Sequence, residues 1–374
     1  MNKFILFQLN MRSCRALVVF ALLFSFLAYL FFVLGNVSVG GPESGNDSNY
    51  YHLSATGLTE SAVNAWPILL RHLNDFGIYH RQAVSVFLYV VFVSVALSTP
   101  KLFVSKSVRS PVNRRDIRKR QYLLGAFLLV YPSFFYYTTD IYRDVFMVGL
   151  FILSIYLLKN YFESHSILLK MLLAALFFML CFYLYQLRPY LGFAVAVAFF
   201  FPWHLNGWRL FALLLSGLVA LMVLKTYGVL DPILRYRGEF GFSRGGATLG
   251  IGLLNTSGLE FLGLFLWSAM AQLVGLFLNS PKALFVFVVE SVPFLLLLAY
   301  VLRNRQYMDR FCLYLFYFFL IYGLVWILGN DNLGTAVRLR LFNYIAIFII
   351  AIRIYSLKRV SDGVYSLAKR RSVR

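Results

Sequence analysis

The sequence predicts an all-α polytopic membrane protein. Apolar residue types make up 60% of its 374 residues and charged residues only 13%, which leaves too little polar surface to cover a soluble domain of this length. Runs of about 17–20 apolar residues recur along the chain and match the thickness of a bilayer's hydrocarbon core. Because these runs do not alternate between polar and apolar residues, as the strands of a barrel do, we expect helices.

The basic residues predict the orientation of these helices. The net charge is +20, and the lysines and arginines lie mostly in short segments between apolar runs, which is the positive-inside pattern of membrane proteins. We therefore expect both termini in the cytoplasm and no nucleic-acid partner. The three cysteines are scattered and suggest neither a disulfide framework nor a metal site. The expected cytoplasmic segments are the N-terminus with Arg12 and Arg15, Pro100–Gln121, Arg303–Arg310 and Leu357–Arg374.

Ten membrane spans follow from the apolar runs, and the first is expected to be an uncleaved anchor because it lacks a small-residue cleavage signal. The spans are residues 16–35, 83–100, 122–138, 145–158, 171–186, 190–203, 209–226, 283–302, 311–328 and 341–356. An eleventh run, Leu259–Leu278, would place Arg303–Arg310 outside if it crossed, so we expect a re-entrant or interfacial segment there. A single crossing at 171–203 would also restore parity, but it would need a helix of about 50 Å. Arg188-Pro189 in its middle favours a hairpin.

The chain 1–374 is thus predicted to form a single integral membrane domain with polar segments on its outer face. The first outer loop, 36–82, should carry an amphipathic helix within Glu60–Phe76, where Val63, Trp66, Leu70 and Leu73 have helical spacing and Pro67 kinks or shortens the helix. Residues 227–282 combine an outer loop with the re-entrant segment, and 357–374 form a basic cytoplasmic tail. The other outer segments are Thr138–Asp144, Gln186–Tyr190 and Gly329–Arg340.

Three carboxylates on this outer face are candidates for chemistry. Asp47 closely follows the first span, with His52 nearby, and a carboxylate there can accept a proton from a sugar hydroxyl or hold a divalent metal ion. Asp140 and Asp144 flank Arg143 in a short turn between two spans. The alternative interpretation is structural, because Asp47 could cap a helix and Arg143 could pair with a neighbouring carboxylate.

Arginines on the outer face point to an anionic substrate, since basic residues are normally depleted there. A guanidinium binds phosphate through two parallel hydrogen bonds, as a polyprenyl diphosphate headgroup would require. Contacts with ordinary lipid headgroups are the alternative. Glu290 lies within a span, where carboxylates also mark ion-coupled transporters. The candidate arginines are Arg143, Arg188, Arg235, Arg237, Arg244, Arg338 and Arg340, of which three lie in a glycine-rich loop suited to a mobile substrate segment.

These motifs resemble those of bacterial multi-spanning glycosyltransferases of envelope polysaccharide synthesis. Asp47 with Tyr51–Ala55 resembles GT-C enzymes, which use polyprenyl-linked sugars. A Pro-Ser … Arg-Asp turn, Tyr131–Ser133 through Tyr142–Asp144, is similar to that of O-antigen and exopolysaccharide repeat-unit polymerases. Weaker likenesses are Leu187–Pro189, Gly334–Arg340, and the spacing of ten residues between Arg235 and Gly246.

The resemblance implies a donor on polyprenyl (di)phosphate, used at the outer face of the bacterial inner membrane. Asp47 would be the base or a metal-site carboxylate, and Arg188, Arg235 and Arg338 would contact the diphosphate. No cofactor is implied with certainty, although a divalent metal ion is a candidate. Implied partners are membrane lipids, a polyprenyl-phosphate-linked glycan, a chain-length regulator and a flippase. The chain departs from the GT-C pattern in lacking a large soluble C-terminal domain, and it has no DxD motif.

Four other functions remain open at this point. A GT-C enzyme adding a single sugar is the nearest alternative to a repeat-unit polymerase. A flippase or ion-coupled transporter usually has related halves with matching broken spans, and no such symmetry is visible. A membrane O-acetyltransferase should have an intramembrane histidine and an early arginine-rich motif. A scaffold subunit without an active site would leave Asp47, Asp140 and the outer arginines dispersed.

Overall fold

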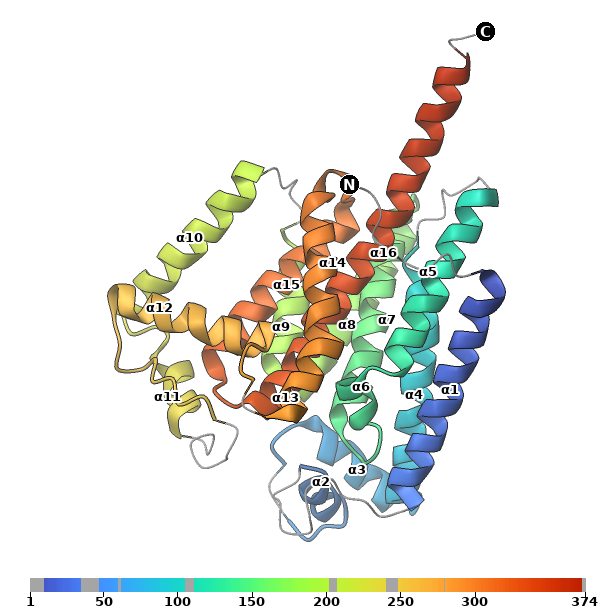
Figure 1. The fold of residues 1–374 in the computed structure, drawn as a ribbon. Helices are drawn as coiled ribbons and strands as arrows, with labels where there is room; N and C mark the ends of the chain where they lie inside the picture. The colour runs from blue at the N-terminus through green and yellow to red at the C-terminus, as the bar shows by residue number, and fades with distance from the viewer. Residues whose placement is uncertain are drawn as a thin grey trace. The chain divides into compact units, whose positions relative to one another are not determined.

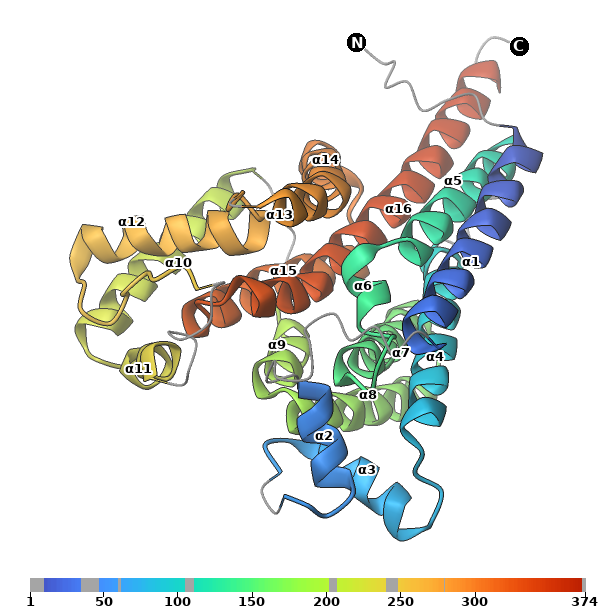
Figure 2. The same ribbon diagram turned by 60° about the horizontal axis from the view of Figure 1, so that its bottom comes forward.

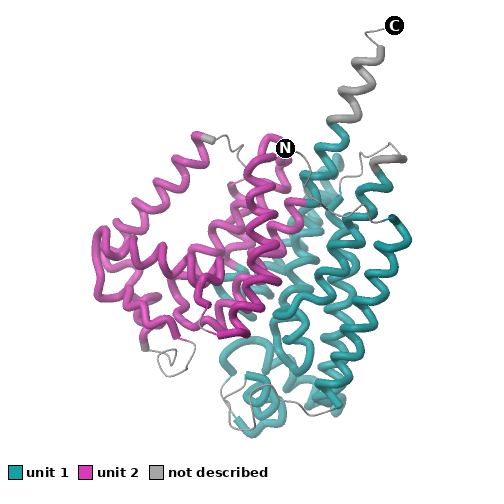
Figure 3. Tube along the Cα trace, viewed as in Figure 1, with its two compact units in different colours: residues 1–192, 352–374 teal, residues 193–351 magenta. Residues whose placement is uncertain are grey.

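The computed structural model confirms the all-α membrane fold. It describes residues 10–34, 47–59, 62–104, 111–201, 207–239, 248–278 and 280–371, with side chains omitted at 111–113, 207, 239 and 362–371. Helices account for most of these residues, and the sole β pairing among them is an isolated bridge between Thr248 and Asn332 (Figure 1). Contacts divide the chain into two compact units, residues 1–192 with 352–374 (unit 1) and residues 193–351 (unit 2) (Figure 3).

Unit 1 is a group of long helices with two short helices at one end. Within it α1 packs on α5, α5 on α4, α4 on α7 and α7 on α8, while α2 packs on α3 (Figures 1 and 2). Its helices are α1 (Met11–Leu34), α2 (Asp47–Ala55), α3 (Ala65–Asp75), α4 (Arg81–Leu102), α5 (Pro111–Leu129), α6 (Pro132–Tyr136), α7 (Arg143–Glu163) and α8 (Ile167–Leu187), with the second half of α16 (Leu333–Arg371).

Unit 2 combines long helices with short and irregular elements. Two of them, η2 and η3, are π-helical turns, which are rare and occur often at functional sites. After α9 (Pro189–Ala198), which crosses the unit boundary, the elements are α10 (Gly207–Thr226), α11 (Asp231–Glu239), α12 (Gly258–Ala269), η2 (Met270–Val274), α13 (Pro281–Val286), η3 (Phe287–Ser291), α14 (Val292–Arg303), the 3₁₀ turn η4 (Arg305–Tyr307), α15 (Arg310–Gly329) and the first half of α16.

Eight helical segments in the described part of the chain are long and apolar enough to cross a membrane. Two of the ten expected spans have a different form. The run 122–138 is interrupted after α5, because Pro132 lacks an N–H and starts a new helix, α6. The run 190–203 contains only α9, whose ten residues extend about 15 Å. The segments are Met11–Leu34, Arg81–Leu102, Arg143–Glu163, Ile167–Leu187, Trp208–Thr226, Pro281–Arg303, Arg310–Gly329 and Leu333–Ser361.

The eleventh apolar run, Leu259–Leu278, is helical only in part. Residues 258–274 are helical, and the helix ends at Gly275, which adopts a left-handed conformation with φ of 79°. Glycine tolerates this conformation without the steric cost that a Cβ atom would add. The helical part is shorter than the eight long segments, and its role as a re-entrant or interfacial segment stays a prediction.

The amphipathic helix expected within Glu60–Phe76 is α3. The side chain of Asn64 caps its start by accepting a hydrogen bond from the Trp66 N–H at 3.0 Å. Pro67 lies in the first turn, where the missing N–H costs no helical hydrogen bond. Trp66 and Leu70 are buried as expected, but Val63 precedes the helix and is 79% exposed, so its assignment to the apolar face was wrong.

Hydroxyl pairs connect α1 to α4 inside unit 1. Tyr29 and Ser85 lie 3.0 Å apart, Ser25 and Tyr89 lie 3.1 Å apart, and the two tyrosine rings stack with centroids 4.4 Å apart. Polar side chains that pair between helices satisfy each other where no water is present.

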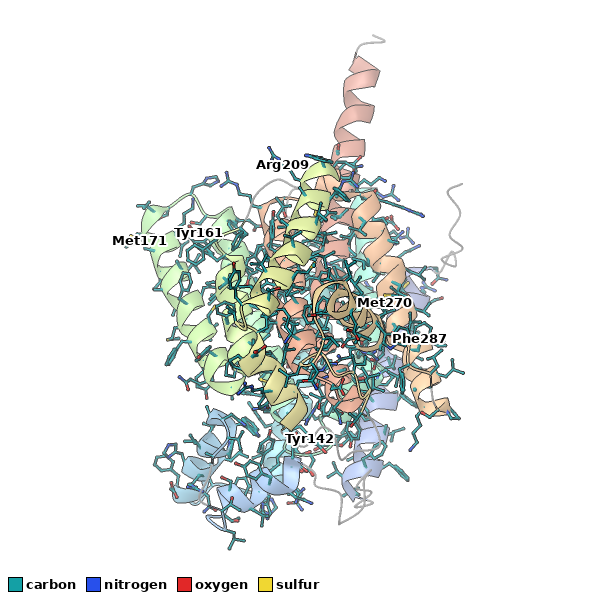
Figure 4. All side chains as sticks on the ribbon, turned by 90° about the vertical axis from the view of Figure 1, so that its left-hand side faces the viewer. Tyr142, Tyr161, Met171, Arg209, Met270 and Phe287 are labelled. Atoms are coloured by element: carbon teal, nitrogen blue, oxygen red, sulfur yellow. The ribbon has the colours of Figure 1, made fainter. Side chains whose placement is uncertain are left out.

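At the other end of α4, the second half of α16 is attached through Arg353, which lies 3.1 Å from the Glu163 carboxylate at the end of α7. Tyr142 and Tyr161, labelled in Figure 4, mark the two ends of α7.

Candidate functional site

Unit 1 contains a half-buried polar cluster where α2 meets the start of α4. The Arg81 guanidinium donates to both carboxylate oxygens of Asp140, at 2.8 and 2.5 Å. Its Nη2 atom also donates to the Asn49 Oδ1 at 2.9 Å and to the Ser48 Oγ at 3.3 Å. A bidentate arginine–carboxylate contact has a well-defined geometry. We call Ser48, Asn49, Arg81 and Asp140 the Arg81 cluster.

The turn that carries Asp140 is held by its own backbone and by α3. The Ile141 N–H donates to the Asp140 Oδ1 at 2.8 Å, and the Trp66 indole N–H donates to the Ile141 carbonyl at 2.8 Å. Burial alone would raise the pKa of Asp140, but the hydrogen bonds from Arg81 and Ile141 outweigh it and lower that pKa. Asp140 is therefore a fixed negative charge and a weak proton acceptor.

A histidine–tyrosine pair lies beside the Arg81 cluster. His52 shares a face of α2 with Ser48, four residues earlier, and its Nδ1 lies 2.9 Å from the Tyr79 hydroxyl. Burial, followed by the charge of Arg81, lowers the pKa of His52, while burial raises the pKa of Tyr79 to about 12. At neutral pH the imidazole is uncharged and the tyrosine protonated. A neutral imidazole is a suitable proton acceptor for general base catalysis.

A second ion pair in unit 1 is fully buried. Asp144 at the start of α7 and Arg188 after α8 lie 3.4 Å apart, with 1% and 3% of their side chains exposed. The neighbouring Arg143 donates to the Leu187 carbonyl at 2.8 Å. These three predicted residues therefore connect the adjacent ends of α7 and α8. Removing one partner of a buried ion pair is strongly destabilising, because the other charge stays in the protein interior.

Unit 2 has its own arginine cluster. The Arg237 guanidinium lies 2.5 Å from Asp331 and donates to the Ile327 carbonyl at 2.9 Å and the Ser268 Oγ at 3.2 Å. Gln272, in the π-helical turn η2, bonds to Ser268 and exchanges side-chain and backbone hydrogen bonds with Asn330. We call Arg237, Ser268, Gln272, Asn330 and Asp331 the Arg237 cluster.

A second buried pair in unit 2 joins α16 to the turn η3. Arg340 lies 3.4 Å from Glu290, with 4% and 0% of the side chains exposed. Next to it, the Tyr344 hydroxyl lies 3.1 Å from Ser291 and donates to the Leu273 carbonyl at 2.6 Å. Gly275 packs directly against the Arg340 guanidinium, where a Cβ atom would overlap it. The two π-helical turns thus supply groups to one buried site.

The sequence-predicted residues divide between the two units. Asp140 and His52 lie in or beside the Arg81 cluster, and Asp47 is the first residue of α2, directly before Ser48. Arg235 is exposed on α11, Arg338 is partly buried on α16, and Arg244 lies outside the described residues. No group of three or more His, Cys, Asp or Glu side chains suited to a metal ion occurs in the described ranges.

Sequence reasoning missed Arg81, Tyr79 and Asp331. Arg81 had a usable signal, because it is an arginine on the predicted outer face directly before an apolar run. Asp331 lies inside the predicted outer segment Gly329–Arg340. In that segment the charge pattern indicates the arginines as candidate site residues but gives no signal for the carboxylate. Tyr79 had no distinguishing pattern, since tyrosines are frequent throughout this chain.

The chain was also compared with known proteins. No family model, no curated protein and no solved structure matches it. Its function is therefore inferred from the residues and geometry described above.

Proposed function

We propose that the protein is a glycosyltransferase of the bacterial inner membrane that polymerises repeat units of O-antigen, capsule or exopolysaccharide. The donor is a sugar or oligosaccharide on polyprenyl (di)phosphate, and both termini are cytoplasmic. The observation that supports this most is the Arg81 cluster with its neighbouring His52. It combines a guanidinium, a charged carboxylate and a neutral imidazole at the end of unit 1 that the charge pattern predicts to be outer.

The reaction forms a glycosidic bond and breaks the bond between the anomeric carbon and phosphate. An acceptor hydroxyl attacks the anomeric carbon and gives its proton to a base. Asp47, at the start of α2, and His52 are the candidate bases, whereas the lowered pKa of Asp140 makes that carboxylate the poorer acceptor. The departing phosphate takes the electron pair of the broken bond, and arginines stabilise its charge. Asp140 keeps Arg81 oriented for this role.

A single-sugar transferase of the GT-C type would use the same groups. Ion-coupled transport is the second candidate function, and one observation favours it. Glu290 is completely buried within a predicted span and paired with Arg340. Intramembrane carboxylates of this kind occur in the proton and ion pathways of transporters.

The test is the banding of surface glycans on a gel from a strain that lacks the protein. We expect the deletion to leave a single repeat unit on the lipid and the wild-type gene to restore a ladder. Asp47→Ala, His52→Gln and Arg81→Lys should each reduce the ladder, and Gln82→Ala, at the next position on α4, is the matched control. A uniform small shift of all bands would indicate a single-sugar transferase. An unchanged pattern in the deletion strain would contradict the proposal.

A further inference from the structure

A polar pocket lies at the far end of α2 from the Arg81 cluster. Its volume is about 240 Å³, and it is formed by the turn after α2 and the last two turns of α3. The polar side chains lining it are Thr56, Thr59, Arg71, Asn74 and Asp75. All of them belong to unit 1, and none is used by the mechanism proposed above.

The pocket is built around a fixed arginine. The Arg71 Nε donates to the Ser54 carbonyl at 3.0 Å, and its Nη2 donates to the Thr59 carbonyl at 2.6 Å. The chain turns between these carbonyls at Gly57, whose φ of 78° is in the left-handed region. The buried Thr59 hydroxyl has no hydrogen-bond partner among the described residues. A group held in place in advance binds a ligand with less loss of entropy.

The chemistry of the lining favours a sugar over a lipid or a free anion. One arginine and one aspartate balance in charge, and the threonines and asparagine add neutral donors and acceptors. A sugar ring offers adjacent hydroxyl groups that both donate and accept hydrogen bonds, which such a mixed set can satisfy. An acyl chain would find too few apolar side chains, and an anion would be repelled by Asp75. We propose that this pocket binds a sugar residue of the acceptor glycan, an inference that rests on the proposed function.

The spacing of the two sites supports this inference. Ser48 and Asn49, in the first turn of α2, belong to the Arg81 cluster, and Ala55, its last residue, borders the pocket. At 1.5 Å per residue the nine-residue helix separates its ends by about 12 Å. A short oligosaccharide spans such a distance. A glycan whose reacting end lies at the Arg81 cluster can therefore place a later sugar in the pocket, which would retain the acceptor between additions.

Binding of free glycans tests the pocket separately from catalysis. The purified full-length protein, in nanodiscs, is applied to an array of bacterial surface polysaccharide fragments. We expect wild-type protein to bind a subset of them and the double variant Asn74→Ala/Asp75→Ala to bind about tenfold more weakly, as loss of two hydrogen bonds predicts. Gln82→Ala is the exposed polar control on the same unit. Both changed side chains are exposed, so the variant should fold, and its thermal unfolding temperature confirms this.

The in vivo ladder then separates the two proposals. We expect the pocket variant to make a ladder of shorter average length, because the acceptor leaves sooner, while the Asp47→Ala variant makes little ladder of any length. Equal glycan binding by wild type and pocket variant would overturn the pocket inference alone. Absence of any polysaccharide change in the deletion strain would overturn the proposed function, whatever the array shows.

Discussion

Two arginine–carboxylate pairs, Arg81–Asp140 in unit 1 and Arg340–Glu290 in unit 2, differ in how accessible they are. In the Arg81–Asp140 pair of unit 1, 31% and 22% of the two side chains are exposed. In the Arg340–Glu290 pair of unit 2 these fractions are 4% and 0%. A partly exposed pair contributes little to stability and leaves its charged groups within reach of a substrate. Breaking a buried pair lowers the stability of the fold strongly, because the remaining charge is not solvated by water. The same residue types therefore suit a binding site at the Arg81–Asp140 pair and a structural contact at the Arg340–Glu290 pair.

The largest expected effect comes from breaking the buried pair. Arg340→Met removes the positive charge beside the buried Glu290 carboxylate and should lower the free energy of unfolding by about 3–5 kcal/mol. The double variant Arg340→Met/Glu290→Leu removes both charges and should recover most of this loss. Thermal unfolding of the purified variants in detergent measures both effects. If the double variant is no more stable than the single one, the two side chains do not act as a pair.

A glycine comparison tests how tightly unit 2 is packed around this pair. Gly275 and Gly57 have nearly equal backbone angles, φ of 79° and 78°, but only Gly275 has neighbours where a Cβ would lie. Gly57→Ala should cost about 1–2 kcal/mol from backbone conformation alone. Gly275→Ala adds an overlap with Arg340, which raises the expected loss by about 1–3 kcal/mol. Equal losses in unfolding free energy for the two variants would show that Arg340 moves aside freely.

Most of the membrane helices could be predicted from the sequence, whereas the pairs within them could not. A long apolar run is a local property, so segments such as Arg310–Gly329 were found almost to the residue. The break before Pro132 was missed, because the run 122–138 stays apolar across it. The local cap of α3 at Asn64 was equally invisible to hydrophobic spacing.

The site residues show the same limit more clearly. Asp140 was selected for its place in a predicted outer turn, yet its partner Arg81 is 59 positions away in the chain. The sequence pattern predicts a loop around Arg237, which was wrong because the residue lies in helix α11, and its partner Asp331 is 94 positions away. The packing of helices against one another determines which of these residues become partners. Local patterns in a single sequence identify charged residues that need a partner. They do not identify the partner.

The partly exposed Arg81–Asp140 pair of unit 1 should affect stability only weakly and in a pH-dependent way. The pKa of Asp140 is lower in the folded protein than its ordinary value of 3.8. Its contribution is therefore present above that ordinary value and is lost as the pH falls through the folded-state pKa. Asp140→Asn should cost no more than about 1 kcal/mol at neutral pH. Unfolding temperatures of wild type and variant should converge at low pH, and a constant difference would contradict the charge-based explanation.

The smallest effect is expected for a substitution of Tyr79, and it tests the role of the neighbouring His52. Since the pKa of His52 is lowered from 6.5, mainly by burial, the imidazole stays neutral until the pH falls below that value. If His52 accepts the proton of the acceptor hydroxyl, the rate of polymer formation in vitro should fall as the pH decreases through the lowered pKa of His52. Tyr79→Phe removes the hydrogen bond between the tyrosine and the imidazole, so we expect a rate loss of about threefold with the acid limb retained. His52→Gln should remove the acid limb itself. An acid limb that persists in His52→Gln would instead assign the proton transfer to Asp47, the other candidate at the start of α2.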